Sequence, residues 1–142
     1  MTHLRAEIEK IFNEIDKNLQ NDKENSMTIY DCFDLQKEDK DKFIDAIFIL
    51  LVLFDYNIKS NFACRLHMAK EIIKCDKTLA QMIIDELWDK KFITFERCKD
   101  VCNFLDAEFE EYKRQNPPTP LEELAKDYPY LSKLVKAFNK KV

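Results

Sequence analysis

The sequence predicts an all-α protein: a single domain, residues 1–142, of about seven antiparallel helices packed around a central hydrophobic helix at about 38–56. One reason is that glycine is absent, although average usage of about 7% would give roughly ten in a chain this long. Tight β-hairpin turns and phosphate-binding loops depend on glycine, so we expect neither a β-meander nor a nucleotide site. The other reason is that apolar residues recur three and four positions apart along most of the chain, as in amphipathic helices.

The N-terminal part begins with such a helix. Its apolar positions are Leu4, Ile8, Ile11, Ile15 and Leu19, with charged residues between them. A polar loop follows and ends near residue 26. Residues 27–35 alternate partly like a strand, but no partner strand is predicted. We therefore expect an irregular or short helical connection there.

The central helix is predicted from nine consecutive apolar residues, Ala46–Phe54, in a chain that is 35% charged. A membrane-spanning helix needs about 20 apolar residues, whereas Asp45 and Asp55 bracket this run. A helix that is apolar nearly all round must be covered by its neighbours. We accordingly expect both Leu50 and Leu53 to be buried.

The next helix, at about 61–74, carries two apolar stripes. A helix with two such faces either lies between layers or presents one face to a partner. The first stripe is Phe62, Leu66, Ala69 and Ile73; the second is Cys64, Met68, Ile72 and Cys75. Because methionine and cysteine adapt to varied surroundings, the second stripe is our first candidate for a partner-binding surface.

Two further helices, a proline-rich break and a C-terminal helical pair complete the order. Asp76 or Thr78 is expected to cap a helix that ends near Lys91. Thr94 is expected to cap a long helix at 95–115. The proline-rich segment 115–120 ends that helix and precedes a short C-terminal helical pair. The last helix is basic and amphipathic, which is typical of a helix that docks on an acidic partner or packs on its own core. Its Leu131, Leu134 and Phe138 form the second candidate partner-binding surface.

Neither a metal nor a catalytic centre is expected. Cys64 and His67, with Cys98 and Cys102, offer four zinc-ligand types. However, Cys98 and Cys102 belong to an apolar seam along the 95–115 helix, where cysteine behaves as a small hydrophobe. His67 lies on a polar strip, so we expect no stoichiometric zinc and no cofactor. No glycine-built oxyanion loop supports a cysteine nucleophile either.

Composition limits the cellular compartment and the kinds of partner that we expect. The five cysteines are odd in number and no signal peptide is predicted, so we expect reduced thiols in the cytoplasm or nucleus. The net charge of −4 gives no bulk attraction for nucleic acid. No membrane span is expected.

Two stretches resemble known families. Residues 79–138 are similar to paired-helix scaffolds of the HEAT or MA3 type: Leu87-Trp88 ends a helix, Ile93-Thr94 starts a second long one, and Pro117–Pro120 follows it. This resemblance implies an interaction scaffold. Residues 69–93 resemble, over a shorter span, the helix-turn-helix of winged-helix regulators, although the would-be recognition helix is acidic and no wing follows.

The expected function is therefore a non-enzymatic protein–protein interaction module, such as an adaptor, an assembly subunit or an inhibitor. Its partner would be another protein or a second copy of the chain. The alternative is a DNA-binding regulator of helix-turn-helix or winged-helix type.

Overall fold

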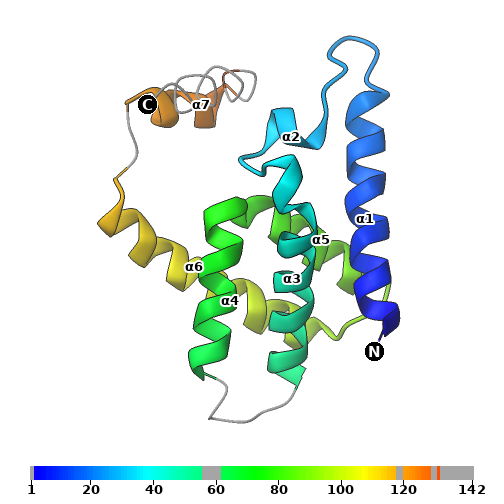
Figure 1. The fold of residues 1–142 in the computed structure, drawn as a ribbon, viewed down its shortest axis with the longest axis vertical. Helices are drawn as coiled ribbons and strands as arrows, with labels where there is room; N and C mark the ends of the chain where they lie inside the picture. The colour runs from blue at the N-terminus through cyan, green and yellow to red at the C-terminus, as the bar shows by residue number, and fades with distance from the viewer. Residues whose placement is uncertain (1, 56–61, 118–119, 129–130, 132–142) are drawn as a thin grey trace.

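The structure is a computed structural model that describes residues 2–55, 62–117, 120–128 and 131 (Figure 1). It confirms the all-α prediction, because the described residues form helices and no strand. The α-helices are α1 (Thr2–Gln20), α2 (Ile29–Cys32), α3 (Lys40–Asp55), α4 (Phe62–Cys75), α5 (Lys77–Asp89), α6 (Phe95–Gln115) and α7 (Pro120–Asp127), and one 3-10 turn, η1 (Lys37–Asp39), precedes α3. The last predicted helix lies outside the described residues, apart from Leu131.

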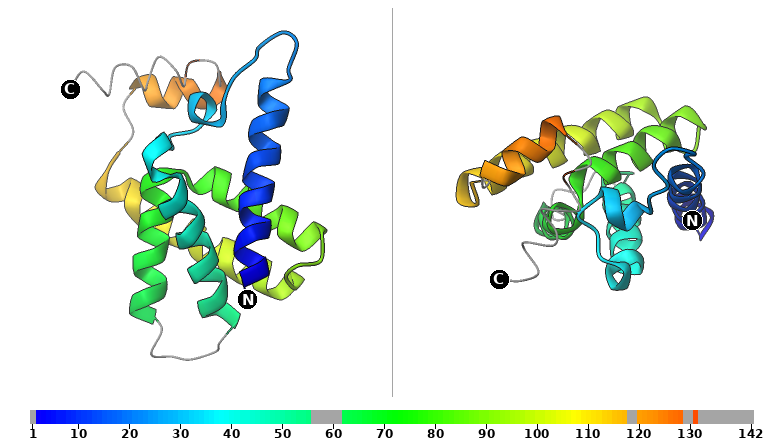
Figure 2. Two further views of the ribbon diagram at one scale, coloured as in Figure 1. Left: turned by 45° about the vertical axis from the view of Figure 1, so that its right-hand side comes forward. Right: turned by 90° about the horizontal axis from the view of Figure 1, so that it is seen from above.

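The helices form two layers. In Figure 1, α1, α3 and α4 run side by side, with α3 pointing opposite to its two neighbours, and the pair α5–α6 crosses behind them. The view from above in Figure 2 shows α5 and α6 together as the second layer. Helix α3 packs against α1, α4 and α6, while α5 packs against α1, α4 and α6. Helix α3 therefore lies where the two layers meet.

The apolar core follows from the sequence of α3. Phe43, Ile44, Ile47, Leu50 and Leu51 are all buried, as expected for a helix covered by neighbours. Coverage is not complete, however. Ile49 is 39% exposed, and Leu53 is only half-buried, so the prediction that Leu53 is buried was wrong. Leu53 lies near the last turn of α3, beyond the main contacts in the middle of the helix.

Two arginines tie the C-terminal end of α3 to the other helices. Arg65 of α4 donates a hydrogen bond from Nη2 to the Leu53 carbonyl at 2.9 Å, and its guanidinium lies 4.1 Å from the centre of the Phe54 ring. Arg97 of α6 pairs with Asp55 at 3.1 Å. Cations at a helix C-terminus interact favourably with its exposed carbonyls, so these contacts fix α4 and α6 against the end of α3.

The predicted caps set the remaining boundaries. Asp76 Oδ1 accepts from the Leu79 amide at 2.9 Å and starts α5, and Thr94 Oγ1 accepts from the Arg97 amide at 3.2 Å and starts α6. The connection at 27–35 contains the short helix α2, as expected. Thr28 and Asp31 form a capping box there, a four-residue signal that the sequence contains.

Helix α3 generates the first prediction. Leu50→Ala should lower the free energy of unfolding by about 2–5 kcal/mol, because it empties a fully buried site. Leu53→Ala should cost only about 1–2 kcal/mol, since that side chain is already partly exposed to solvent. Urea unfolding followed by circular dichroism measures both. Leu124→Ala, at an exposed position of α7, is the control and should change stability by no more than about 0.5 kcal/mol. Equal costs at positions 50 and 53 would contradict this packing.

Candidate functional site

The first predicted partner-binding stripe is not a continuous surface. Cys64 is exposed, and Met68 and Cys75 are half-buried, but Ile72 is completely buried. Including Ile72 in an accessible surface was therefore wrong. The physical reason is that α4 packs against α3 on one side and against α5 and α6 on the other. Exposure on α4 consequently differs around the helix: His67, Lys70 and Lys74 are exposed, whereas Ile72 and Ile73 are buried.

The second predicted surface is described only at its start. Leu131 is half-buried. Leu134 and Phe138 lie outside the described residues.

A different apolar surface lies where α5 turns into α6. Trp88, Phe92 and Phe95 are 43%, 44% and 56% exposed, respectively. The Trp88 and Phe95 rings approach each other with centroids 5.1 Å apart. We call these three residues the aromatic corner. Sequence reasoning used Trp88 only to mark the end of a helix and so missed this surface.

The geometry of the turn explains why these side chains point outward. Helix α5 ends in a Schellman motif: the Phe92 amide donates to the Leu87 carbonyl at 2.8 Å, and the Lys91 amide donates to the Trp88 carbonyl at 2.9 Å. Lys91 occupies the left-handed position with φ 68°, where glycine is usual. Ile93 then enters the core and Thr94 caps α6. The corner is therefore fixed by two helix ends and one buried anchor.

An open hollow of about 480 Å³ adjoins the corner. Its wall consists of Asp55, Trp88, Lys91, Phe92, Ile93, Thr94, Phe95 and Arg97. Asp55 and Arg97 form an ion pair there. Lys91 is exposed and forms no ion pair within the described part of the chain. The hollow thus offers aromatic surface with one available cation at its rim.

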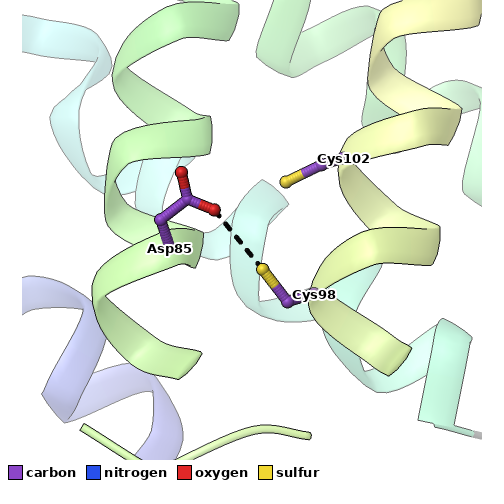
Figure 3. Close-up of side chains that lie close together, drawn as sticks. All are labelled: Asp85, Cys98 and Cys102. Atoms are coloured by element: carbon purple, nitrogen blue, oxygen red, sulfur yellow. Dashed lines mark hydrogen bonds between the residues drawn. The ribbon is translucent and has the colours of Figure 1, made fainter. Parts of the chain in front are cut away.

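A second constellation lies between α5 and α6. Asp85, Cys98 and Cys102 present one oxygen and two sulfur atoms that all lie within 4.8 Å of one another (Figure 3). The Cys98 thiol donates to Asp85 Oδ1 at 3.4 Å. Cys98 is 5% exposed, Cys102 is half-buried and Asp85 is exposed. We call these three residues the thiol cluster. Cys64 and His67, the other half of the zinc set considered from the sequence, are not part of it.

Both thiols of this cluster are held in the protonated form. Burial, followed by the nearby Cys98 and Asp85, raises the pKa of Cys102 to about 12. Burial and the hydrogen bond to Asp85 also raise the pKa of Cys98. Burial likewise raises the pKa of Cys75, on α4, to about 11. The thiolate is the nucleophilic form, so an activated cysteine has a lowered thiol pKa. The pKa values of these three cysteines are shifted in the opposite direction.

No protein-family model, curated protein or solved structure matches this chain. None of the helices in the described segments combines the length and the apolarity needed to cross a membrane.

The turn at the aromatic corner generates the second prediction. Lys91→Gly should raise the free energy of unfolding by about 1 kcal/mol, because glycine adopts positive φ without the steric cost that a β-carbon imposes. Lys91→Ala is the matched control, since it removes the same charge but keeps the β-carbon. Urea unfolding of the two variants measures the difference. Equal stability of the Gly and Ala variants would contradict the left-handed conformation at this position.

Proposed function

We propose that this chain is a non-enzymatic protein–protein interaction module that binds another protein through the aromatic corner. The observation that carries the proposal is the gathering of three exposed aromatic side chains on one turn. Tryptophan and other aromatic residues dominate the binding energy of many protein interfaces. Contiguous exposed apolar surface on a protein commonly marks an interaction site.

The rigidity of the corner supports this role. Its two helix ends are capped, Ile93 anchors it in the core, and the Asp55–Arg97 pair braces the hollow beside it. A surface that is already ordered loses little conformational entropy when it binds. The hollow next to the rings gives an incoming side chain a place to bury.

The chemistry of the rim indicates the kind of partner. An apolar or aromatic side chain fits against Trp88 and Phe95, and an acidic group beside it would meet Lys91. Charge complementarity of this kind favours one orientation and speeds encounter. The partner is accordingly a protein segment that combines an apolar anchor with a neighbouring carboxylate.

The surface of α5 does not favour the DNA-binding alternative. Asp85, Glu86 and Asp89 are all exposed. Lys77 is paired with Asp106 at 2.7 Å, and Lys90 with Glu14 at 3.0 Å. DNA-binding helices need cations that are free to meet phosphates. In addition, only Asp76 separates α4 from α5, whereas a helix-turn-helix has a turn of three or four residues.

Thiol chemistry is consistent with a non-enzymatic module in a reducing compartment. None of the five cysteines forms a disulfide, which fits the cytoplasm or nucleus. The raised thiol pKa values of Cys75, Cys98 and Cys102 argue against a cysteine nucleophile at these positions. We therefore propose an adaptor, assembly subunit or inhibitor rather than an enzyme.

The third prediction tests the corner. Partners captured from the native cell by the wild-type chain should bind the double variant Trp88→Ser/Phe95→Ser at least tenfold more weakly, because it removes two aromatic anchors. Phe62→Ser is the matched control, since Phe62 is 59% exposed but lies on α4. It should retain binding. Quantitative pull-down measures the affinities, and circular dichroism verifies folding.

Fluorescence adds a direct readout, because Trp88 is the only tryptophan in the chain. Titration with the purified partner should shift Trp88 emission to shorter wavelength as the ring leaves water. Unchanged emission, or equal loss of binding in the Phe62 control, would contradict the proposal. A sizing column distinguishes a second copy of the chain from another protein, and a dimer broken by the double variant would assign the corner to self-association instead.

A further inference from the structure

We propose that the thiol cluster, Asp85 with Cys98 and Cys102, is a binding site for one thiophilic divalent cation of the zinc type. Three donor atoms from two helices converge on one small volume (Figure 3). The proposal is independent of the partner-binding role given above.

The spacing on α6 brings the two sulfur atoms together. Cys98 and Cys102 are four residues apart, so they share one helix face on consecutive turns. Asp85 lies across from them on α5. In a tetrahedral zinc site, Zn–S bonds of about 2.3 Å place two sulfurs roughly 3.8 Å apart, with a sulfur and a carboxylate oxygen roughly 3.5 Å apart. The observed 3.4 Å between Cys98 Sγ and Asp85 Oδ1 already matches the second of these separations.

The donor types select the class of ion. Two thiolates and one carboxylate suit a borderline-soft cation such as Zn²⁺ and do not suit Mg²⁺ or Ca²⁺, which prefer oxygen ligands. The ion would displace a proton from each thiol, and its two positive charges would offset most of the three negative charges of the ligands. Because Asp85 is exposed, water can supply the fourth ligand from the solvent side.

Neighbouring contacts hold the two helices in position around the cluster. Gln81, one turn before Asp85, donates to the Cys102 carbonyl at 3.3 Å and to Asp106 Oδ1 at 2.8 Å. Lys77 pairs with the same carboxylate oxygen at 2.7 Å. These bonds fix α5 against α6 beside the ligands. Outer contacts of this kind orient metal ligands and strengthen binding.

A disulfide between the two cysteines is a poorer fit. Residues four apart on a helix have β-carbons about 5–6 Å apart, whereas a disulfide needs about 3.8 Å. A metal ion can bridge two cysteines whose β-carbons are about 5–6 Å apart, because it lies between their sulfur atoms. The expectation from the sequence that no zinc is bound rested on the apolar seam that contains Cys98 and Cys102 and on the position of His67 on a polar strip. That argument applies to the four-residue set and does not involve Asp85, which only the packing of α5 on α6 brings to the thiols.

The fourth prediction tests the site with Co²⁺ as a probe. Titration of the reduced, metal-free chain should produce thiolate-to-cobalt charge-transfer absorption that saturates at one equivalent and disappears on adding Zn²⁺. Cys102→Ser should abolish the band, and Asp85→Asn should weaken Co²⁺ binding at least tenfold. Cys64→Ser and Cys75→Ser are the matched controls, because they remove thiols outside the cluster, and they should leave the titration unchanged.

Three outcomes would overturn the proposal. One is that the wild-type chain gives no thiolate–cobalt absorption. A second is that Asp85→Asn titrates like the wild type; this variant changes an exposed carboxylate and so decides the matter even if Cys102→Ser fails to fold by circular dichroism. The third is that Cys64→Ser loses the band, which would assign binding to Cys64 and His67.

Discussion

The need to cover the apolar surface of α3 is the constraint on which the rest of the structure depends. Its buried positions include Phe43, Ile47 and Leu50 on one row and Ile44 and Leu51 on the next. Together they form an apolar face that is too broad for a single neighbour to shield. Helices α1, α4 and α6 do so together. Transfer of each large apolar side chain out of water stabilises the fold by about 1.5–3 kcal/mol. Arg65 and Arg97 then fix the C-terminal end of α3, where apolar contacts become fewer.

The same constraint explains where apolar surface remains open. The second layer meets the first along α5 and the N-terminal half of α6, where Ile83, Leu87 and Val101 are buried. The turn between these helices extends past that contact, so Trp88 and Phe95 are left half in solvent. The cluster of Asp85 with the two cysteines lies one turn inside, on the α5–α6 interface itself. The aromatic corner and the thiol cluster are thus neighbouring parts of one helical hairpin, α5 and α6.

The sequence predicts the helices well because helix formation is local. The spacing of apolar residues, the uncharged run of α3 and the capping residues Asp76 and Thr94 are all visible in short segments. Prediction from the sequence fails where the burial of a residue depends on which helix covers which face of its neighbour. Ile72 was assigned to a surface stripe although it is core, because two stripes on α4 do not reveal that both face other helices. The proximity of Asp85 to Cys98 and the outward turn at Phe92 likewise require the packing of α5 on α6. The spacing gives no signal of the exposure at Trp88, because this residue continues the row of Ala80 and Ile84, which are both buried.

Native-state amide hydrogen exchange tests most directly whether α3 holds the fold together. Amides in the buried part of a core helix exchange only when the whole domain unfolds. The amides of residues 44–51 should therefore show a free energy of opening equal to that of global unfolding, whereas those of α7, which has few contacts with the other described helices, should exchange through much smaller openings. Exchange of the α3 amides at low free energy while α5 and α6 stay protected would contradict a fold organised around α3.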